Sequence, residues 1–282
     1  MKIHLGANAY GKNAINLSKI IRHADRHEFR HISVNVILEG DFETVHTEGD
    51  NSKVLPTDTQ KNTVYALAKD YLNSSIEAFG LVLAEHFMSN NGHLSKTTIE
   101  LTEHNWSRIL NDGQPHPTAF MNSGNDKHYA RIEKTRTKAV VFSGISDLLI
   151  LKTTDSAFTG YIKDKYTTLK EADDRILCTQ CEATWEYTAS NLDFDTLYRD
   201  IRTSLLATFA MHHSLSVQHT LYAMGENILK EFDMVQEISL KMPNKHHIPV
   251  NLEPFGMRND NEVFIATDEP YGYISGTVKR GG

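Results

Sequence analysis

The sequence lacks the features that mark membrane-spanning, disulfide-stapled and low-complexity proteins. Its 282 residues contain only two cysteines, too few for a disulfide framework, which agrees with a reducing compartment. Glycine (16) and proline (7) are sparse, and no tract is compositionally biased. The longest apolar runs, such as residues 148–151, are far shorter than the roughly 18 to 20 residues that cross a bilayer. No secretory leader or peroxisomal tripeptide is visible, so we expect a globular, cytoplasmic protein without a membrane partner.

The charge balance and the missing motifs exclude further function classes. Acidic residues (36) outnumber basic ones (29), so no nucleic-acid partner is expected. No GxxxxGK[ST], GxGxxG, GxSxG or HExxH string occurs, which argues against standard nucleotide-binding loops, a hydrolase elbow and a helix-borne zinc pair. Cys178 and Cys181 lie in a strand-like segment and would point to opposite faces. We therefore expect two packing residues and no metal site, despite fifteen histidines.

Hydrophobic periodicity in the first half predicts antiparallel strands and helices. Residues 29–46 alternate between apolar and polar side chains, which is typical of a strand with one solvated face, and residues 98–102 repeat the pattern. Half-polar strands of this kind favour an antiparallel sheet. Between them, four apolar residues follow the spacing of a helix with one buried stripe: Ile76, Phe79, Leu83 and Phe87.

The second half repeats this order, which predicts an α+β fold made of two duplicated ββααββ units. Strand-like segments at 140–154 and 183–187 precede helical patterns at 197–209 and 217–228, and short apolar segments follow around 235–240, 247–252 and 263–266. Each half also contains a capping-box sequence that predicts a helix start, at residues 57–60 and 168–171. A polar stretch at 134–138 separates the halves and predicts modules of residues 1–137 and 138–282.

Strings spread over the whole chain resemble the uricase (urate oxidase) family. They are YGK at 10–12, EGDNS at 48–52, TDTQKNTVYA at 57–66, LKTTDSAFTGYIKDKYTTLKEADDRIL at 151–177, HSLSVQHTLYAMG at 213–225, MPNKHHIPVNL at 242–252 and NEVF at 261–264. The resemblance implies the tunnelling fold, in which subunits pair to close an antiparallel barrel and barrels stack into a homotetramer. It places the active sites at subunit interfaces, and the missing peroxisomal tripeptide favours a bacterial enzyme.

The resemblance also implies a set of substrate-binding residues. Urate is planar and acidic with donors and acceptors around its rim, so its site needs a forked cation, a flat apolar platform and an amide. By resemblance, Arg175 holds urate in a bidentate manner, Phe158 stacks on its ring, Gln218 binds the opposite edge and Val217 adds a backbone contact. Without the resemblance, Arg175 would be a solvated residue two turns into a helix and Phe158 a core residue.

Proton transfer is assigned by resemblance to Lys12, Thr57 and His246, and dioxygen or water to Asn244. Thr57 and Asp58 fall at a predicted helix N-terminus, where free N–H groups favour an anionic ligand, and in the family this edge comes from the neighbouring subunit. From spacing alone, Thr57 is equally well explained as a helix cap and Lys12 as an exposed lysine. As a base, Lys12 needs burial or a nearby cation such as protonated His246 to disfavour its charged form.

The implied reaction uses urate and dioxygen with no cofactor. Proton removal through Thr57 and Lys12 gives a urate dianion that reacts directly with dioxygen; hydrogen peroxide then leaves and water adds to give 5-hydroxyisourate. Two alternatives stay open. A metal-dependent purine- or pterin-ring hydrolase of the same architecture would need a Cys/His ligand set. A non-catalytic purine-binding barrel would keep Arg175 and Gln218 but could dispense with Lys12 and Thr57.

Overall fold

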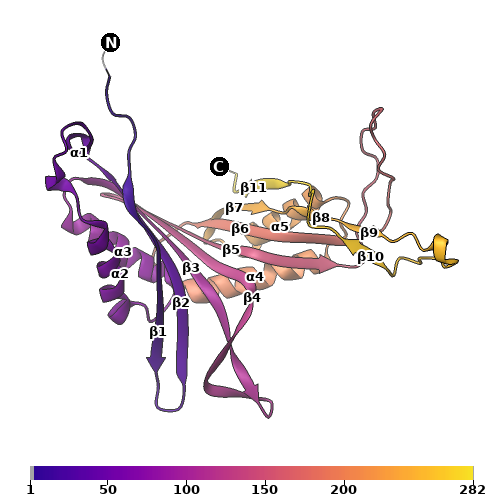
Figure 1. Ribbon diagram of the computed structural model, residues 1–282, viewed down its shortest axis with the longest axis horizontal. Coiled ribbons are helices and arrows are strands. Elements are labelled where there is room, and N and C mark those ends of the chain that lie inside the picture. Colours follow the sequence, from indigo (N-terminus) through magenta and orange to yellow (C-terminus); the bar gives the residue numbers. More distant parts are fainter. Residues whose placement is uncertain (1–2, 282) are drawn as a thin grey trace. The chain divides into compact units, whose positions relative to one another are not determined.

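The computed structural model describes residues 3–281, and its contacts divide the chain into two compact units (Figure 1). The first unit runs up to Gly144 and includes Glu186–Tyr198, and the second contains Ile145–Trp185 and the chain from Arg199 onward. The division therefore falls inside strands β5 (Ala139–Lys152) and β6 (Leu177–Tyr187) and inside helix α4 (Phe194–Met211). No helix among the described residues is long and apolar enough to cross a bilayer.

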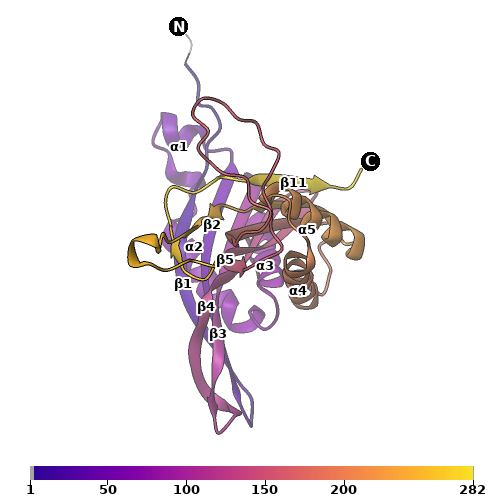
Figure 2. The same cartoon turned by 90° about the vertical axis from the view of Figure 1, so that its right-hand side faces the viewer.

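The first unit contains an antiparallel sheet with the strand order β1-β2-β3-β4. Helices α2 and α3 lie on one face of this sheet (Figures 1 and 2). A short helix and a 3-10 turn connect β2 to α2. The bounds are β1 Tyr10–Arg22, β2 His27–Gly40, α1 Glu43–Thr47, η1 Asn51–Lys53, α2 Thr57–Tyr71, α3 Ile76–Asn90, β3 Leu94–Asn111 and β4 Gln114–Thr135.

The buried stripe predicted for the first unit is confirmed. Ile76, Phe79, Leu83 and Phe87 of α3 are fully buried, and so are the inward-facing residues of β2 and β3, which are Ile32, Val34, Val36, Leu38, Ile99 and Leu101. The predicted strand at 29–46 is wrong beyond Gly40. The pairing of β2 with β3 shifts register between Glu39 and Gly40, the Asp41 N–H turns to the His93 carbonyl, and α1 then begins at Glu43.

The second unit repeats the pattern with two helices beside an antiparallel set of strands. Helices α4 and α5 lie side by side (Figure 2) and are linked by an Asn227–Ser204 hydrogen bond of 3.0 Å. Strands β6, β7 and β11 are neighbours in that order, β8 pairs with β6, and β9 and β10 form a separate hairpin. The bounds are α5 Val217–Glu231, β7 Val235–Lys241, β8 Asn244–Lys245, β9 His247–Pro249, η2 Glu253–Phe255, β10 Phe264–Ala266 and β11 Ser275–Lys279. The element order therefore confirms the predicted duplicated α+β fold.

The capping box predicted at 168–171 does not open a helix, and the expectation that Arg175 lies in a helix is wrong. Residues 163–171 form an irregular loop. Asp164 closes a turn by accepting hydrogen bonds from Tyr166 N and the Thr167 hydroxyl. Glu171 pairs with Lys163 at 2.9 Å instead of capping Thr168. Because these side chains already form hydrogen bonds and an ion pair within the loop, they do not cap a helix start.

The capping box predicted at 57–60 is also absent, although a helix does begin there. Helix α2 starts with Thr57 as its first residue, and Pro56 occupies the cap position. The Gln60 side chain donates to the Leu55 carbonyl at 3.2 Å instead of reaching back to Thr57. Thr57 is therefore not the helix cap, and its hydroxyl forms no hydrogen bond within residues 3–281.

Candidate active site

Arg175 and Phe158 meet in the second unit. The Arg175 guanidinium carbon lies 5.2 Å from the centroid of the Phe158 ring, and Tyr161 stacks on that ring at 4.9 Å with an interplanar angle of 15°. Main-chain hydrogen bonds join Phe158 to Ala172 in both directions, at 2.8 and 3.2 Å, which draws the segment before Arg175 against Phe158. Phe158 is thus part of an aromatic platform beside a cation, which fits stacking on a flat anionic ligand.

Arg175 is a half-buried cation that no carboxylate in the described chain neutralises. Its Nε is buried without a hydrogen-bond partner, and burial alone lowers the pKa of its guanidinium from the ordinary value. Buried cations and unpaired buried donors are costly, so such a group is usually satisfied by a ligand or partner. The planar fork of Arg175 is thereby left available for an anion from outside the chain.

The start of α5 lies beside the Phe158 segment. The Ala157 N–H donates to the Ser214 carbonyl at 2.7 Å, and the Ser214 N–H donates to the Asp155 carbonyl at 3.1 Å. Two residues later Ser216 caps α5, with its hydroxyl accepting from His219 N at 3.1 Å. Val217 is buried at the first helical position, and Gln218 is exposed at the second. Their N–H groups precede the intrahelical bonds and favour an anion at this point.

Strand β8 brings Asn244 to the beginning of β6, immediately after Arg175. Asn244 pairs with Thr179 and is only 9% exposed, and its N–H donates to the Gly272 carbonyl at 2.9 Å. His246 follows with an exposed side chain, while its carbonyl accepts hydrogen bonds from the Thr267 N–H and hydroxyl. The second unit thus contains all six site residues predicted beyond position 150.

Lys12, Thr57 and Asp58 lie together in the first unit. The Tyr10 hydroxyl accepts from Leu55 N at 2.9 Å, which ties the start of β1 to the segment entering α2. Lys12 is half-buried in β1 at a bulge, where the Ala14 N–H donates to Asn35 Oδ1 at 2.8 Å. The pKa of Asp58 is lowered, mainly by its hydrogen bond from Lys61 and to a smaller extent by the charge of Lys12.

The Asp58 side chain forms hydrogen bonds within its own helix. Its carboxylate accepts hydrogen bonds from Lys61 and from Asn62, the latter at 3.0 Å. A free carboxylate would repel an anionic ligand, but the Asp58 carboxylate is bonded to Lys61 and Asn62. The backbone N–H groups at the start of α2 are therefore the groups that would attract an anion here. The free hydroxyl of Thr57 stands at the same place.

The two cysteines are packing residues, as predicted. Cys178 and Cys181 are both buried and free, and burial raises the pKa of the Cys181 thiol to about 12. A buried thiol of this kind is unreactive and a poor metal ligand. Among residues 3–281, no group of three or more His, Cys, Asp or Glu side chains is arranged to hold a metal ion.

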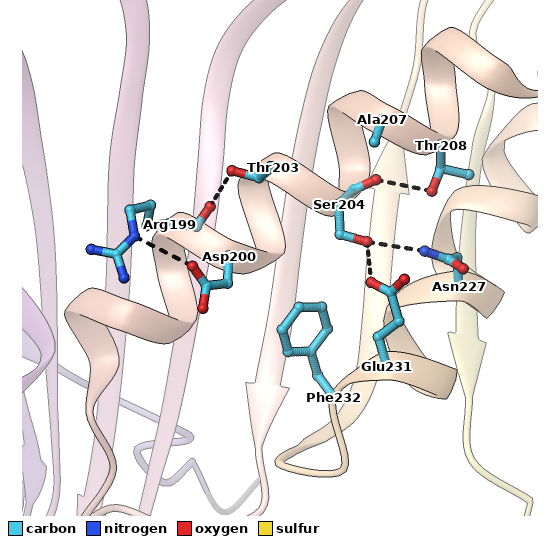
Figure 3. Close-up of a pocket in the computed structure, with 9 residues that line it drawn as sticks. All are labelled: Arg199, Asp200, Thr203, Ser204, Ala207, Thr208, Asn227, Glu231 and Phe232. Carbon is cyan, nitrogen blue, oxygen red and sulfur yellow. Dashed lines mark hydrogen bonds and ion pairs between the residues drawn. The ribbon is translucent and has the colours of Figure 1, made fainter.

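A hollow of about 400 Å³ between α4 and α5 is separate from these residues (Figure 3). Its polar side chains bond to one another: the Ser204 hydroxyl donates to Glu231 at 2.5 Å and accepts from Asn227. Arg199 pairs with Asp200 at 3.3 Å. None of the predicted site residues lines this hollow.

Asp174, the residue before Arg175, is not among the site residues predicted from the sequence. Its carboxylate accepts a 2.6 Å hydrogen bond from the Thr154 hydroxyl and a 3.3 Å bond from Ser156 N. Adjacency to Arg175 was the only available sequence signal, because the partners lie about twenty residues away in the chain.

Comparison with known proteins assigns both units to one family. The family model described as Uricase matches residues 8–133 and 141–275. The uricase of Arthrobacter globiformis is 43% identical over 281 residues, covering 100% of this chain and 91% of that protein. The uricase of Danio rerio is 36% identical, with coverages of 96% and 93%.

Solved structures agree with the sequence comparison. The crystal structure of the Arthrobacter globiformis uricase superposes with a TM-score of 0.95 at 42% identity, covering 100% of this chain and 96% of that chain. The urate oxidase of Bacillus sp. TB-90 has a TM-score of 0.86 at 24% identity, with coverages of 97% and 100%, and so supports the fold alone. Because the family model matches both halves and full-length relatives exceed 30% identity, the chain belongs to the uricase family.

Proposed function

We propose that this protein oxidises urate with dioxygen and water to 5-hydroxyisourate and hydrogen peroxide, using the residues described above. Membership of the uricase family supports urate oxidase activity. The observation that carries the site assignment is Arg175, a half-buried cation with an unpaired Nε beside the Phe158 ring. No ligand set for a metal-dependent hydrolase accompanies it among residues 3–281.

Urate binding is the task we assign to the second unit. Arg175 would hold a carbonyl and ring nitrogen of urate through two charge-assisted hydrogen bonds, while Phe158 stacks on the ring. Gln218 would bind the opposite edge with its amide, and the N–H of Val217 at the start of α5 would donate to the anion. Asn244 would hold dioxygen or water above the ring plane. Together these groups fix the plane and the orientation of the substrate.

Proton transfer is the task we assign to Thr57, Lys12 and His246. The Thr57 hydroxyl is not used by the helix, so it is free to relay a proton from urate to Lys12. The resulting dianion reacts with dioxygen directly, and the fixed donors stabilise its charge without reorganising. We propose that the reaction needs no cofactor, because the electrons come from the substrate dianion itself.

The functional unit that we propose is a homotetramer with active sites at subunit interfaces, each subunit made of modules 1–137 and 138–282. Strand β1 is the end strand of the first unit's sheet, and end strands present unpaired main-chain groups to another chain. Apolar side chains are also strongly exposed on the loop between Phe158 and Arg175, with Ile162 at 95%, Tyr166 at 76% and Leu169 at 60%. Exposed apolar groups of this kind are typical of an interface.

The test is a urate assay of the purified, chelator-treated protein under air and under argon. Loss of urate absorbance and release of peroxide are followed together. We expect oxygen-dependent loss of urate with one peroxide per urate, unaffected by chelation. Turnover that disappears with chelation and returns with a metal would contradict the cofactor-free reaction. If the protein binds urate without turning it over, the assignment of the binding residues stands and the assignment of the catalytic residues is wrong.

A further inference from the structure

The segment that carries Phe158 is held between two other segments of the second unit. On one side, Ser156 forms a parallel bridge with Ser214, which leads into α5. On the other side, Phe158 bridges Ala172. Between Ala172 and the start of β6 at Leu177, residues 173–176 belong to no helix or strand. Arg175 therefore lies in a stretch whose position is not set by regular main-chain pairing.

The Asp174 carboxylate ties this stretch to the Phe158 segment. One oxygen accepts from the Thr154 hydroxyl at 2.6 Å, and the other accepts from the main-chain N–H of Ser156 at 3.3 Å. The carboxyl pKa is lowered, first by the Thr154 hydrogen bond and then by the N–H groups of Ser156, Asp155 and Arg175. Ser156 is fully buried, so the carboxylate is attached to a fixed point.

This attachment also keeps Asp174 from neutralising Arg175. A carboxylate one residue from a guanidinium could form an ion pair with it, yet the Asp174 carboxylate contacts Thr154 and Ser156 instead. Burial, and not a charged neighbour, lowers the pKa of Arg175. The lone pairs of Asp174 are instead used by Thr154 and by main-chain donors. Arg175 stays beside the Phe158 ring with its fork unpaired.

We propose that Asp174 is a positioning residue for urate binding, which acts by fixing Arg175 beside Phe158 while leaving the guanidinium free for the substrate. The inference rests on the proposed function, because it assumes that Arg175 and Phe158 bind urate. Asp174 is not among the residues to which we assign urate contacts, because its carboxylate is bonded to Thr154 and Ser156 and its negative charge is unfavourable for an anion nearby. Its contribution is therefore geometric: an amide that restores both contacts preserves binding, and a methyl group does not.

The experiment compares four variants of the full-length protein with the wild type: Asp174→Ala, Asp174→Asn, Thr154→Val and Asp173→Ala. Asp173 is the matched control, since it is an exposed neighbour of the same charge without these hydrogen bonds. Urate affinity is measured by equilibrium dialysis without oxygen, KM and kcat under air, and assembly by sedimentation. The Asn side chain can accept from Ser156 N and donate to the Thr154 oxygen, so it serves as the conservative variant.

For Asp174→Ala we expect a rise of about tenfold or more in the urate Kd and KM, with a smaller fall in kcat. Asp174→Asn should recover most of that loss, Thr154→Val should weaken binding by about threefold, and Asp173→Ala should match the wild type. A purely structural role would lower kcat and the assembled fraction and leave KM unchanged, which would overturn the proposal.

The failure of the inference is distinguishable from the failure of the proposed function. If the wild type binds and oxidises urate but Asp174→Ala has wild-type affinity, the positioning role is wrong and the function stands. If the wild type binds no urate, the proposed function is wrong and the inference fails with it. If Asp174→Ala does not assemble, the variants Asp174→Asn and Thr154→Val decide the question. The geometric role is refuted if Thr154→Val binds urate with wild-type affinity and Asp174→Asn binds it about tenfold more weakly.

Discussion

Arg175 is the residue whose removal should affect substrate affinity most. Replacing it with alanine would remove the two charge-assisted hydrogen bonds to urate that we propose, which together would contribute at least about 3 kcal/mol. We expect the urate Kd of Arg175→Ala, measured without oxygen, to rise by more than about a hundredfold. The urate Kd of Arg175→Lys should lie between those of the wild type and Arg175→Ala, because an ammonium keeps the charge but lacks the planar fork.

Arg199→Ala is the control for this prediction. Arg199 is an exposed arginine of the same unit that pairs with Asp200 at the hollow between the helices (Figure 3). Its removal should leave the urate Kd within about twofold of the wild-type value, since exposed ion pairs contribute little. A Kd for Arg175→Ala within threefold of wild type would show that another group binds the anion.

At this scale the sequence named candidate residues but did not predict the local structure around them. The resemblance pointed to Arg175 and Phe158, but the helix expected around Arg175 is a loop. The Thr-x-x-Glu pattern at 168–171 is compatible with a helix start. The alternative partners of its residues, Lys163 for Glu171 and the Tyr161 hydroxyl for the Leu169 carbonyl, depend on the folded loop. Likewise, no local pattern reports that Ala172 bridges Phe158 and brings Arg175 to its ring.

Among the elements, β1 positions Lys12 through a close approach at Gly11. A Cβ at this position would lie 1.8 Å from the Val36 carbonyl oxygen on β2, and main-chain atoms cannot move aside cheaply. Gly11→Ala should therefore push β1 away from β2 and displace Lys12. We expect the free energy of unfolding to fall by about 1–3 kcal/mol and kcat to fall with it.

Urea denaturation and the aerobic urate assay check this prediction. Gly92→Ala is the matched control, because no atom lies within 4 Å of a Cβ there. It should retain wild-type stability within about 0.5 kcal/mol. Unchanged turnover and stability in Gly11→Ala would mean that β1 tolerates displacement and that the position of Lys12 is not critical.

Helix α3 is fixed to the sheet of the first unit by a buried ion pair. Glu77 is fully buried, and its Oε1 accepts from His128 Nε2 at 2.7 Å and from the Ser143 hydroxyl. Removing Glu77 leaves the His128 ring nitrogen and the Ser143 hydroxyl buried without their common acceptor. We expect Glu77→Ala to lower the free energy of unfolding by about 3–5 kcal/mol at neutral pH. Glu85→Ala on the same helix breaks the pair with Lys134 and an exposed hydrogen bond from Ser89, and it should cost less than about 1 kcal/mol.

The same pair predicts how stability depends on pH. Desolvation by burial is the largest influence on the Glu77 carboxyl and raises its pKa, but His128 and Ser143 outweigh it, so the pKa in the folded protein lies below the ordinary value of 4.5. A lowered carboxyl pKa contributes stability above the ordinary value, and that contribution is lost as the pH falls below it. Urea unfolding at a series of pH values should show the difference between wild type and Glu77→Ala shrinking below about pH 4.5. A constant difference would show that the ionised pair is not what stabilises α3.

The elements were largely predictable because each buried face has a sequence period. Phe79, Leu83 and Phe87 follow the 3.6-residue period and lie in the core, and Val34 and Val36 follow the two-residue period. The Glu77–His128 pair was not predictable, because its partners lie 51 positions apart in the sequence. Glu77 also lies outside the apolar stripe of α3, so the pattern does not mark its carboxylate as buried. Such pairs follow from the packing of α3 on β4, which no local sequence signal encodes.

At the scale of the whole molecule, the proposed interface site leads to a prediction that single variants cannot test. Thr57 belongs to the first unit and Arg175 to the second. If each site takes Thr57 from one subunit and Arg175 from another, mixed assemblies of Thr57→Val and Arg175→Ala chains contain some intact sites. With equal coexpression and random pairing, about a quarter of the sites would be intact. Each variant alone should be nearly inactive, since a general acid–base group such as Thr57 contributes about 10² to 10⁴ to the rate and the loss of Arg175 weakens urate binding.

Activity of the coexpressed pair decides between interface sites and sites built within one chain. Recovery of about a quarter of wild-type turnover supports the interface, because an intact site then combines wild-type residues from two different chains. Thr57→Val coexpressed with Lys12→Met is the matched control: both residues lie on the same edge of the first unit, where Tyr10 ties β1 to the entry of α2, so each edge still lacks one group. That pair should stay inactive. If neither pair recovers while both assemble as the wild type does, Thr57 and Arg175 serve the same site from a single chain.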